Sequence, residues 1–204
     1  MPAPAKLFLA SSNTGKLREY SALAETVSSA GRFVIAPLPD FNALPPFSEN
    51  AQTFSENAAG KALHYSRVTD EAVFADDSGL VVPALRGAPG VHSARYAGEH
   101  AGNAERIAKL LVEMRGKTGG DREAHFVCVI ALARAGKVLA VVTDRVQGEL
   151  LEAPRGSQGF GYDPVFFFPS LGMTFAELSP QEKNLHSHRG KAFRKLLAYV
   201  VQAF

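Results

Sequence analysis

The sequence predicts an α/β fold in which a long mixed central β-sheet carries flanking helices, arranged as two lobes with a cleft between them. Short apolar runs alternate with helical patterns in the first half of the chain. Two long apolar segments, joined at Ala135-Gly136, then predict a β-hairpin. The 204 residues, 46% of them hydrophobic, suffice for one domain spanning residues 1–204.

The first half of the chain shows the expected alternation. Its predicted elements are a strand at 6–10, a helix over 17–27, a short strand at 33–37, an aperiodic Pro-rich loop and a helix over 53–68. Thr53 and Glu56 form a capping box that predicts where the last of these helices begins.

The stretch from Ala72 to Val82 predicts two short strands separated by a tight turn. The apolar run Ala72–Ala75 leads into Asp76 and Asp77, and Ser78-Gly79 follows before the next apolar run. Asp, Ser and Gly are common in solvated turns, which is the simpler interpretation of these residues. If the carboxylates are instead buried at the end of a strand, they need Mg²⁺ or basic side chains as partners.

The second half predicts the remaining elements. They are an ordered loop over 83–102, an amphipathic helix at 103–115, a polar linker over 117–122, strands at 123–134 and 137–147, a turn-rich segment over 148–161, a helix beginning at Ser179-Pro180 and a final helix from 191.

Two segments have the composition of anion sites. Ser11–Lys16 lies between the first strand and the first helix, where backbone N–H groups and a lysine bind phosphate. Simple capping of that helix by Ser12, Asn13 or Thr14 is the alternative. Lys61 is either solvated or within reach of a phosphate, and the sequence leaves both open.

The region after residue 158 combines glycines, aromatic residues and a basic cluster. Gly159 and Gly161 flank Phe160, which suits close approach of a flat ligand, although the aromatic residues could equally be core. The histidines at 186 and 188 lack the helical spacing of zinc ligands. The nearby basic residues predict an edge that meets an anion or a base.

Composition argues against several classes of function. The net charge of +2 gives no strong field for nucleic acid or a membrane surface. No apolar run approaches the roughly 20 residues of a membrane span. The single cysteine, Cys128, lies in an apolar run, so we expect buried packing in a reducing cytoplasm.

Six motifs, in order along nearly the whole chain, carry a resemblance to a known family. They are SSNTGKLREY, SENAQTFSENAAGKA, FADDSGL, GAPGVHSARYAG, GFGYDPVFF and EKNLHSHRGKAF. Together they resemble the noncanonical purine nucleoside triphosphate pyrophosphatases, the inosine/xanthosine triphosphate pyrophosphatase or Ham1-like family. The resemblance implies a two-lobed fold, usually a homodimer, and a Mg²⁺-dependent hydrolase.

The implied reaction converts ITP, dITP or XTP to the monophosphate and pyrophosphate, which removes deaminated purines from the nucleotide pool. By position, Asp77 matches the base that activates water, and Lys16 and Lys61 match phosphate-side lysines. The acids linked to the metal are Asp77, Asp76 and Glu49.

The resemblance also implies the substrate contacts. The triphosphate loop comprises Ser11, Ser12, Asn13, Thr14, Gly15 and Lys16, and Ser78 is a further contact. Phe160 stacks on the base, and Gly161, Tyr162 and Asp163 complete that wall. Lys183, His188 and Arg189 recognise the base. Ser12 stands where many relatives have Gly, and we expect little effect from this small side chain.

Two alternatives have distinct signatures. A Maf-type pyrophosphatase, acting on pyrimidine or modified nucleotides, would carry Ser-x-Ser-x-Arg where this chain has Ser-Ser-Asn-Thr-Gly-Lys. A non-catalytic nucleotide sensor would bind ITP without releasing pyrophosphate, but it has no need of a water-activating base. The Asp76-Asp77 pair and Lys16 therefore favour the enzyme.

Overall fold

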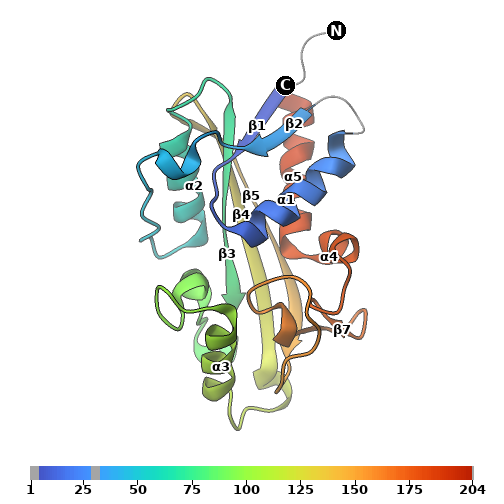
Figure 1. Ribbon diagram of the computed structural model, residues 1–204. Coiled ribbons are helices and arrows are strands. Elements are labelled where there is room, and N and C mark those ends of the chain that lie inside the picture. The colour runs from blue at the N-terminus through green and yellow to red at the C-terminus, as the bar shows by residue number, and fades with distance from the viewer. Residues whose placement is uncertain (1–4, 29–32, 204) are drawn as a thin grey trace. The chain divides into compact units, whose positions relative to one another are not determined.

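The computed structural model describes residues 5–28 and 33–203, and the chain folds into two compact units (Figure 1). Of the described residues, 5–28, 33–77, 128–144 and 190–203 belong to the first unit, and 78–127 and 145–189 belong to the second. Three strands each begin in one unit and end in the other.

A mixed seven-stranded sheet has the order β2-β1-β3-β4-β5-β6-β7. Its strands are β1 (Ala5–Leu9), β2 (Phe33–Pro37), β3 (Ala72–Val81), β4 (Glu123–Arg134), β5 (Lys137–Leu150), β6 (Phe166–Phe168) and β7 (Met173–Thr174). β1 pairs in parallel with β2 and β3, whereas β6 is antiparallel to β5 and β7. The predicted mixed sheet with flanking helices is confirmed.

In the first unit the sheet is covered on both faces. The helices are α1 (Thr14–Ser28), α2 (Phe54–Tyr65) and α5 (His188–Ala203), which belongs to this unit from Gly190 onward. Leu7, Phe74 and Ile130 pack with residues of α1 and α5, whereas Val73 and Ala131 pack with α2. Because strand side chains alternate, β3 and β4 contribute to both cores. Figure 1 shows α1 and α5 beside each other and α2 apart from them.

β3 is one continuous strand of ten residues, so the predicted turn at Asp76-Asp77-Ser78-Gly79 is wrong. The turn interpretation rests on local preference, but Gly79 and both aspartates are buried inside the sheet. Beyond them, the backbone N–H of Leu80 donates to Ser93 Oγ at 2.9 Å. Side-chain partners elsewhere in the fold therefore supply the hydrogen bonds that water would supply in a turn.

The second unit has its own core. α3 (Asn103–Glu113) contributes Ile107 and Leu110, which pack with Leu80, Phe126 and other residues of this unit. The predicted loop over 83–102 and the polar linker contain the short 3₁₀ helices Pro83–Leu85, Gly90–Arg95 and Gly119–Arg122. Further 3₁₀ turns are Asp163–Val165 and, in the first unit, Phe41–Ala43.

Most predicted boundaries agree with the structure. The β4–β5 turn has positive φ at both Ala135 (49°) and Gly136 (73°), as a tight two-residue hairpin requires. Ser179 caps α4 (Pro180–His186) through a capping box with Glu182. The first helix begins earlier than predicted, at Thr14, which places Lys16 in its first turn.

Within the described ranges, no helix is long and apolar enough to cross a membrane.

Gly148 on β5 gives a test of the packing in the second unit. A Cβ added there would overlap the Phe167 carbonyl oxygen and lie 2.6 Å from the Phe166 ring. We predict that Gly148→Ala lowers the free energy of unfolding by about 1–3 kcal/mol, measured by urea denaturation. Gly120→Ala is the matched control, because its Cβ would meet nothing within 4 Å. Equal stability of the two variants would contradict this packing.

Candidate active site

Asp76 and Asp77 are buried in the middle of β3, with exposed fractions of 1% and 5%. As consecutive strand residues they point to opposite faces of the sheet. Asp76 continues the series Ala72, Phe74, which faces α1 and α5, and Asp77 continues Val73, Ala75, which faces α2. A buried carboxylate needs a polar partner, so each face must supply its own.

Lys16 is the partner of Asp76. Its Nζ lies 2.9 Å from Asp76 Oδ1 and donates to the Asp76 carbonyl oxygen at 3.1 Å. On the same face, Cys128 Sγ lies 3.9 Å from Asp76 Oδ2. The predicted basic partner of the acidic pair is thus present, and the predicted buried cysteine is confirmed.

The segment before α1 caps the helix that carries Lys16. Asn13 Oδ1 accepts from the Lys16 backbone N–H at 3.0 Å, and Ser11 Oγ accepts from Asn13 N–H at 3.2 Å. Capping by Asn13, one of the two interpretations of this segment, is therefore observed. It is compatible with phosphate binding, because the first N–H groups of a helix lack intrahelical partners. Ser12, Asn13 and Thr14 are exposed, whereas Gly15 is buried.

Asp77 is bound by Asn57 of α2, whose Nδ2 donates to Asp77 Oδ2 at 2.9 Å. Burial raises the pKa of the Asp77 carboxyl from 3.8 to about 6, although Lys16 and the Asn57 hydrogen bond act in the opposite direction. The negative charges of Glu49 and Asp76 raise this pKa further. A carboxylate with such a pKa is suited to take up a proton near neutral pH.

Lys61 and Glu49 form an ion pair, with Nζ 2.5 Å from Oε1. The Lys61 side chain is only 12% exposed, so it is not an ordinary solvated lysine. Asn57 and Lys61 lie four residues apart on α2, and both contact acidic residues of the predicted site. Within residues 5–28 and 33–203 no group of three or more His, Cys, Asp or Glu side chains is arranged to hold a metal.

Asp163 organises a second group of predicted site residues, in the second unit. Its Oδ2 accepts from Lys183 Nζ at 2.5 Å and from the Phe160 backbone N–H at 2.7 Å. Asp163 and Lys183 are both buried. A Cβ on Gly159, whose φ is +72°, would overlap Asp163 Oδ2. Glycine is therefore required where the chain passes this carboxylate.

Arg189 and Lys183 both lie near the ring of Phe160. The Arg189 guanidinium carbon is 5.4 Å from the ring centroid, and Lys183 Nζ is 5.0 Å from it. Arg189 Nη2 also donates to Ser78 Oγ at 2.7 Å. The structure thus brings together four of the residues predicted to contact substrate: Ser78, Phe160, Lys183 and Arg189.

Two other predicted contacts have structural partners. Tyr162 is buried and its hydroxyl donates to the Ser93 carbonyl oxygen at 3.0 Å. Burial also raises the pKa of Tyr162, so its hydroxyl stays protonated. The His188 ring stacks on Phe126, with centroids 4.7 Å apart and an interplanar angle of 9°.

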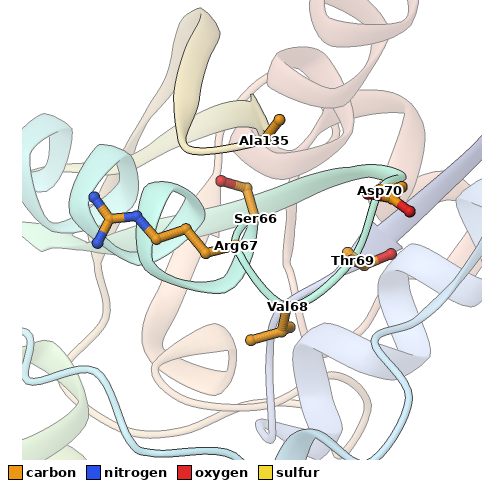
Figure 2. Close-up of a pocket in the computed structure, with 6 residues that line it drawn as sticks. All are labelled: Ser66, Arg67, Val68, Thr69, Asp70 and Ala135. Atoms are coloured by element: carbon orange, nitrogen blue, oxygen red, sulfur yellow. The ribbon is translucent and has the colours of Figure 1, made fainter.

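A surface hollow of about 490 Å³ lies elsewhere in the first unit (Figure 2). It is lined by Ser66, Arg67, Val68, Thr69, Asp70 and Ala135. These residues precede β3 or belong to the β4–β5 turn, and none of them is a predicted site residue. Asp77 lies seven residues along the chain from Asp70. The hollow therefore contains none of the residues that the sequence predicts to act on a substrate.

Asn57 is the functional candidate that the sequence alone does not single out. Its spacing from Lys61 places both on one helix face, but its partner Asp77 is twenty residues away in the sequence. The only signal is a polar residue at a helix position that turns out to be buried.

Comparisons with known proteins identify the same family that the six sequence motifs resemble. The model of the Ham1 family matches residues 7–199. The chain is 50% identical over 192 residues to the dITP/XTP pyrophosphatase of Geobacillus kaustophilus (strain HTA426), covering 94% of this chain and 92% of that protein. It is 45% identical over 193 residues to the dITP/XTP pyrophosphatase of Vibrio cholerae serotype O1, covering 94% of each.

Solved structures give the same result. A HAM1 protein from Coxiella burnetii superposes with a TM-score of 0.85 at 42% identity, covering 98% of this chain and 100% of that one. The Staphylococcus aureus Ham1 protein gives 0.83 at 35% identity, with the same coverage. On the sequence match, the structural likeness and the motifs together, the chain belongs to the Ham1 family.

Proposed function

We propose that this protein is a nucleoside triphosphate pyrophosphatase that hydrolyses dITP, ITP and XTP to the monophosphate and pyrophosphate. The observation that carries the proposal is the buried Asp77 carboxylate, with its raised pKa, in the same unit as the Lys16–Asp76 pair. The names of relatives that are about half identical to this chain support the substrate class.

In this mechanism Asp77 takes a proton from a water molecule. The water oxygen forms a bond to the α-phosphorus while the bond from that phosphorus to the bridging oxygen breaks, so pyrophosphate leaves. With a pKa of about 6, Asp77 is mostly ionised at pH 7–8 and remains a usable base. Lys16 and Lys61 provide positive charge for the phosphates.

Asp77 and Glu49 are the residues that would hold Mg²⁺. Protein-bound Mg²⁺ commonly uses one or two carboxylates together with substrate phosphates, so a cluster of three acids is not needed. When bound, the metal supplies charge neutralisation on the phosphates and a more acidic water. Asp76 is paired with Lys16, and we assign it to orienting that lysine.

The residues around Phe160 account for the preference among purine nucleobases. Hypoxanthine and xanthine carry a carbonyl at the purine 6-position, where adenine carries an amine. Lys183 and Arg189 have only hydrogen-bond donors, so they match the carbonyl and meet the amine badly. The stacking surface is Phe160, beside which both cations lie. We also propose a homodimer, on the ground of family membership. A cytoplasmic location is supported by the one cysteine, Cys128, which is buried.

A nucleotide panel with product identification tests this function. With Mg²⁺ present, dITP, ITP and XTP should be preferred over ATP, UTP and dTTP, and pyrophosphate should be the first product. Chelation of Mg²⁺ should abolish turnover. Orthophosphate as first product would overturn the reaction, a preference for UTP or dTTP would favour Maf-type activity, and ITP binding without turnover would indicate a sensor.

Asp77→Asn should lower kcat by about 10²–10⁴-fold, as expected for loss of a general base, while the nucleotide still binds.

The same variant should be more stable than the wild type above pH 7 without Mg²⁺. Because the folded-state pKa of about 6 exceeds the ordinary 3.8, the proton on Asp77 favours folding, and that contribution is lost as pH rises through 6.

The stability difference should be about 3 kcal/mol at most at pH 8 and should disappear as the pH falls below the ordinary value of 3.8, measured by urea unfolding in EDTA. The exposed residue Asp121 provides the control variant Asp121→Asn. An Asp77→Asn protein that retains full activity, or whose relative stability is independent of pH, would remove Asp77 as the buried base.

Arg189→Ala should reduce hydrolysis of ITP more than that of ATP, narrowing the ratio of their kcat/KM values by about 10–100-fold. Arg189 is buried, so the substitution also affects folding. The ratio of the kcat/KM values for ITP and ATP, measured on one protein sample, does not depend on the fraction of protein that is folded. An unchanged ratio would mean that Arg189 does not recognise the base.

A further inference from the structure

Asn57 is a fully buried polar residue in the first turn of α2, with 1% of its surface exposed. A buried amide is costly unless its polar atoms are hydrogen-bonded. Its partners come from two different segments. One is the backbone of Ala51, six residues earlier, and the other is the carboxylate of Asp77 on β3.

The Ala51 backbone fixes which way the Asn57 amide points. Ala51 N–H lies 3.0 Å from Asn57 Oδ1, and an N–H group can only donate, so the amide oxygen must face Ala51. The amide nitrogen then faces Asp77, with a weaker contact of 3.4 Å to the Ala51 carbonyl oxygen. A flipped amide would set two donors against each other at Ala51 and two acceptors against each other at Asp77.

The hydrogen bond from Asn57 restricts the Asp77 carboxylate. Asn57 Nδ2 lies 2.9 Å from Asp77 Oδ2. Among the described residues, no other side chain donates a hydrogen bond to Asp77. A carboxylate fixed through one oxygen presents its other oxygen in a defined direction. Ala51 is also two residues from Glu49, so the same amide links Asp77 to the segment that carries this second acid.

We propose that Asn57 is a positioning residue for the hydrolysis, which holds Asp77 so that its second oxygen faces the attacking water. This role rests on the proposed function. A base displaced by about 1 Å can lose on the order of 10²-fold in rate. The competing explanation is that Asn57 only secures the segment around Ala51 to α2.

Asn57→Asp separates these two explanations. An aspartate at this position has nearly the same shape and still accepts from Ala51 N–H, but it offers no amide donor to Asp77. If Asn57 positions Asp77, kcat for dITP should fall about 10–100-fold while KM changes less than about threefold. Rates are normalised to the folded fraction from circular dichroism. Asn42→Asp, at an exposed position, controls for the added charge and should keep the wild-type kcat.

A second experiment tests the contact between residues 57 and 77 without measuring enzyme activity. Asn57→Asp should lower the melting temperature, because two carboxylates then face each other. Adding Asp77→Asn restores one donor and one acceptor with their places exchanged. The double variant should recover at least half of the lost melting temperature, yet remain inactive because the base is gone.

The outcomes are decisive. A kcat for Asn57→Asp within twofold of the wild type, a change confined to KM, or no recovery in the exchanged pair would overturn the positioning role. Wild-type protein that releases no pyrophosphate from dITP would overturn the proposed function itself, and the role of Asn57 with it. In that case the melting temperatures would still report the contact with Asp77.

Discussion

The structure of the first unit depends on burying two consecutive carboxylates in a strand that is covered on both faces. Strand geometry sends Asp76 toward α1 and α5 and Asp77 toward α2. Each face then has to provide a partner, Lys16 on one side and Asn57 on the other. The two aspartates consequently differ: Asp76 forms an ion pair with Lys16, whereas Asp77 accepts from a neutral amide, and burial raises the pKa of Asp77 to about 6. That difference is the reason why we propose Asp77, and not Asp76, as the general base.

The second unit also buries a carboxylate, that of Asp163, together with its hydrogen-bond partners. Asp163 is buried and accepts hydrogen bonds from Lys183 and from the backbone of Phe160. It thereby fixes a cation and an aromatic ring near each other, and Arg189 lies beside the same ring. A fixed stacking surface with nearby donors suits recognition of a flat base that carries carbonyl groups.

The sequence predicts the elements with strong local signals and misses those set by distant contacts. The hairpin at Ala135-Gly136 and the capping box at Ser179 agree with the structure, because turn chemistry and capping are local. The turn predicted at Asp76-Asp77 is wrong, since Lys16 and Asn57 stabilise an extended backbone there. Asn57 had no assigned role, because its contact with Asp77 forms only when α2 packs against β3.

Our proposal depends above all on Asp77 and Lys16 acting together on the phosphates of one nucleoside triphosphate. A crystal structure of the Asp77→Asn variant with dITP and Mg²⁺ tests it most directly. The α-phosphate should lie next to residue 77, with the phosphates within reach of Lys16. A triphosphate bound away from residue 77 and Lys16 would contradict this assignment.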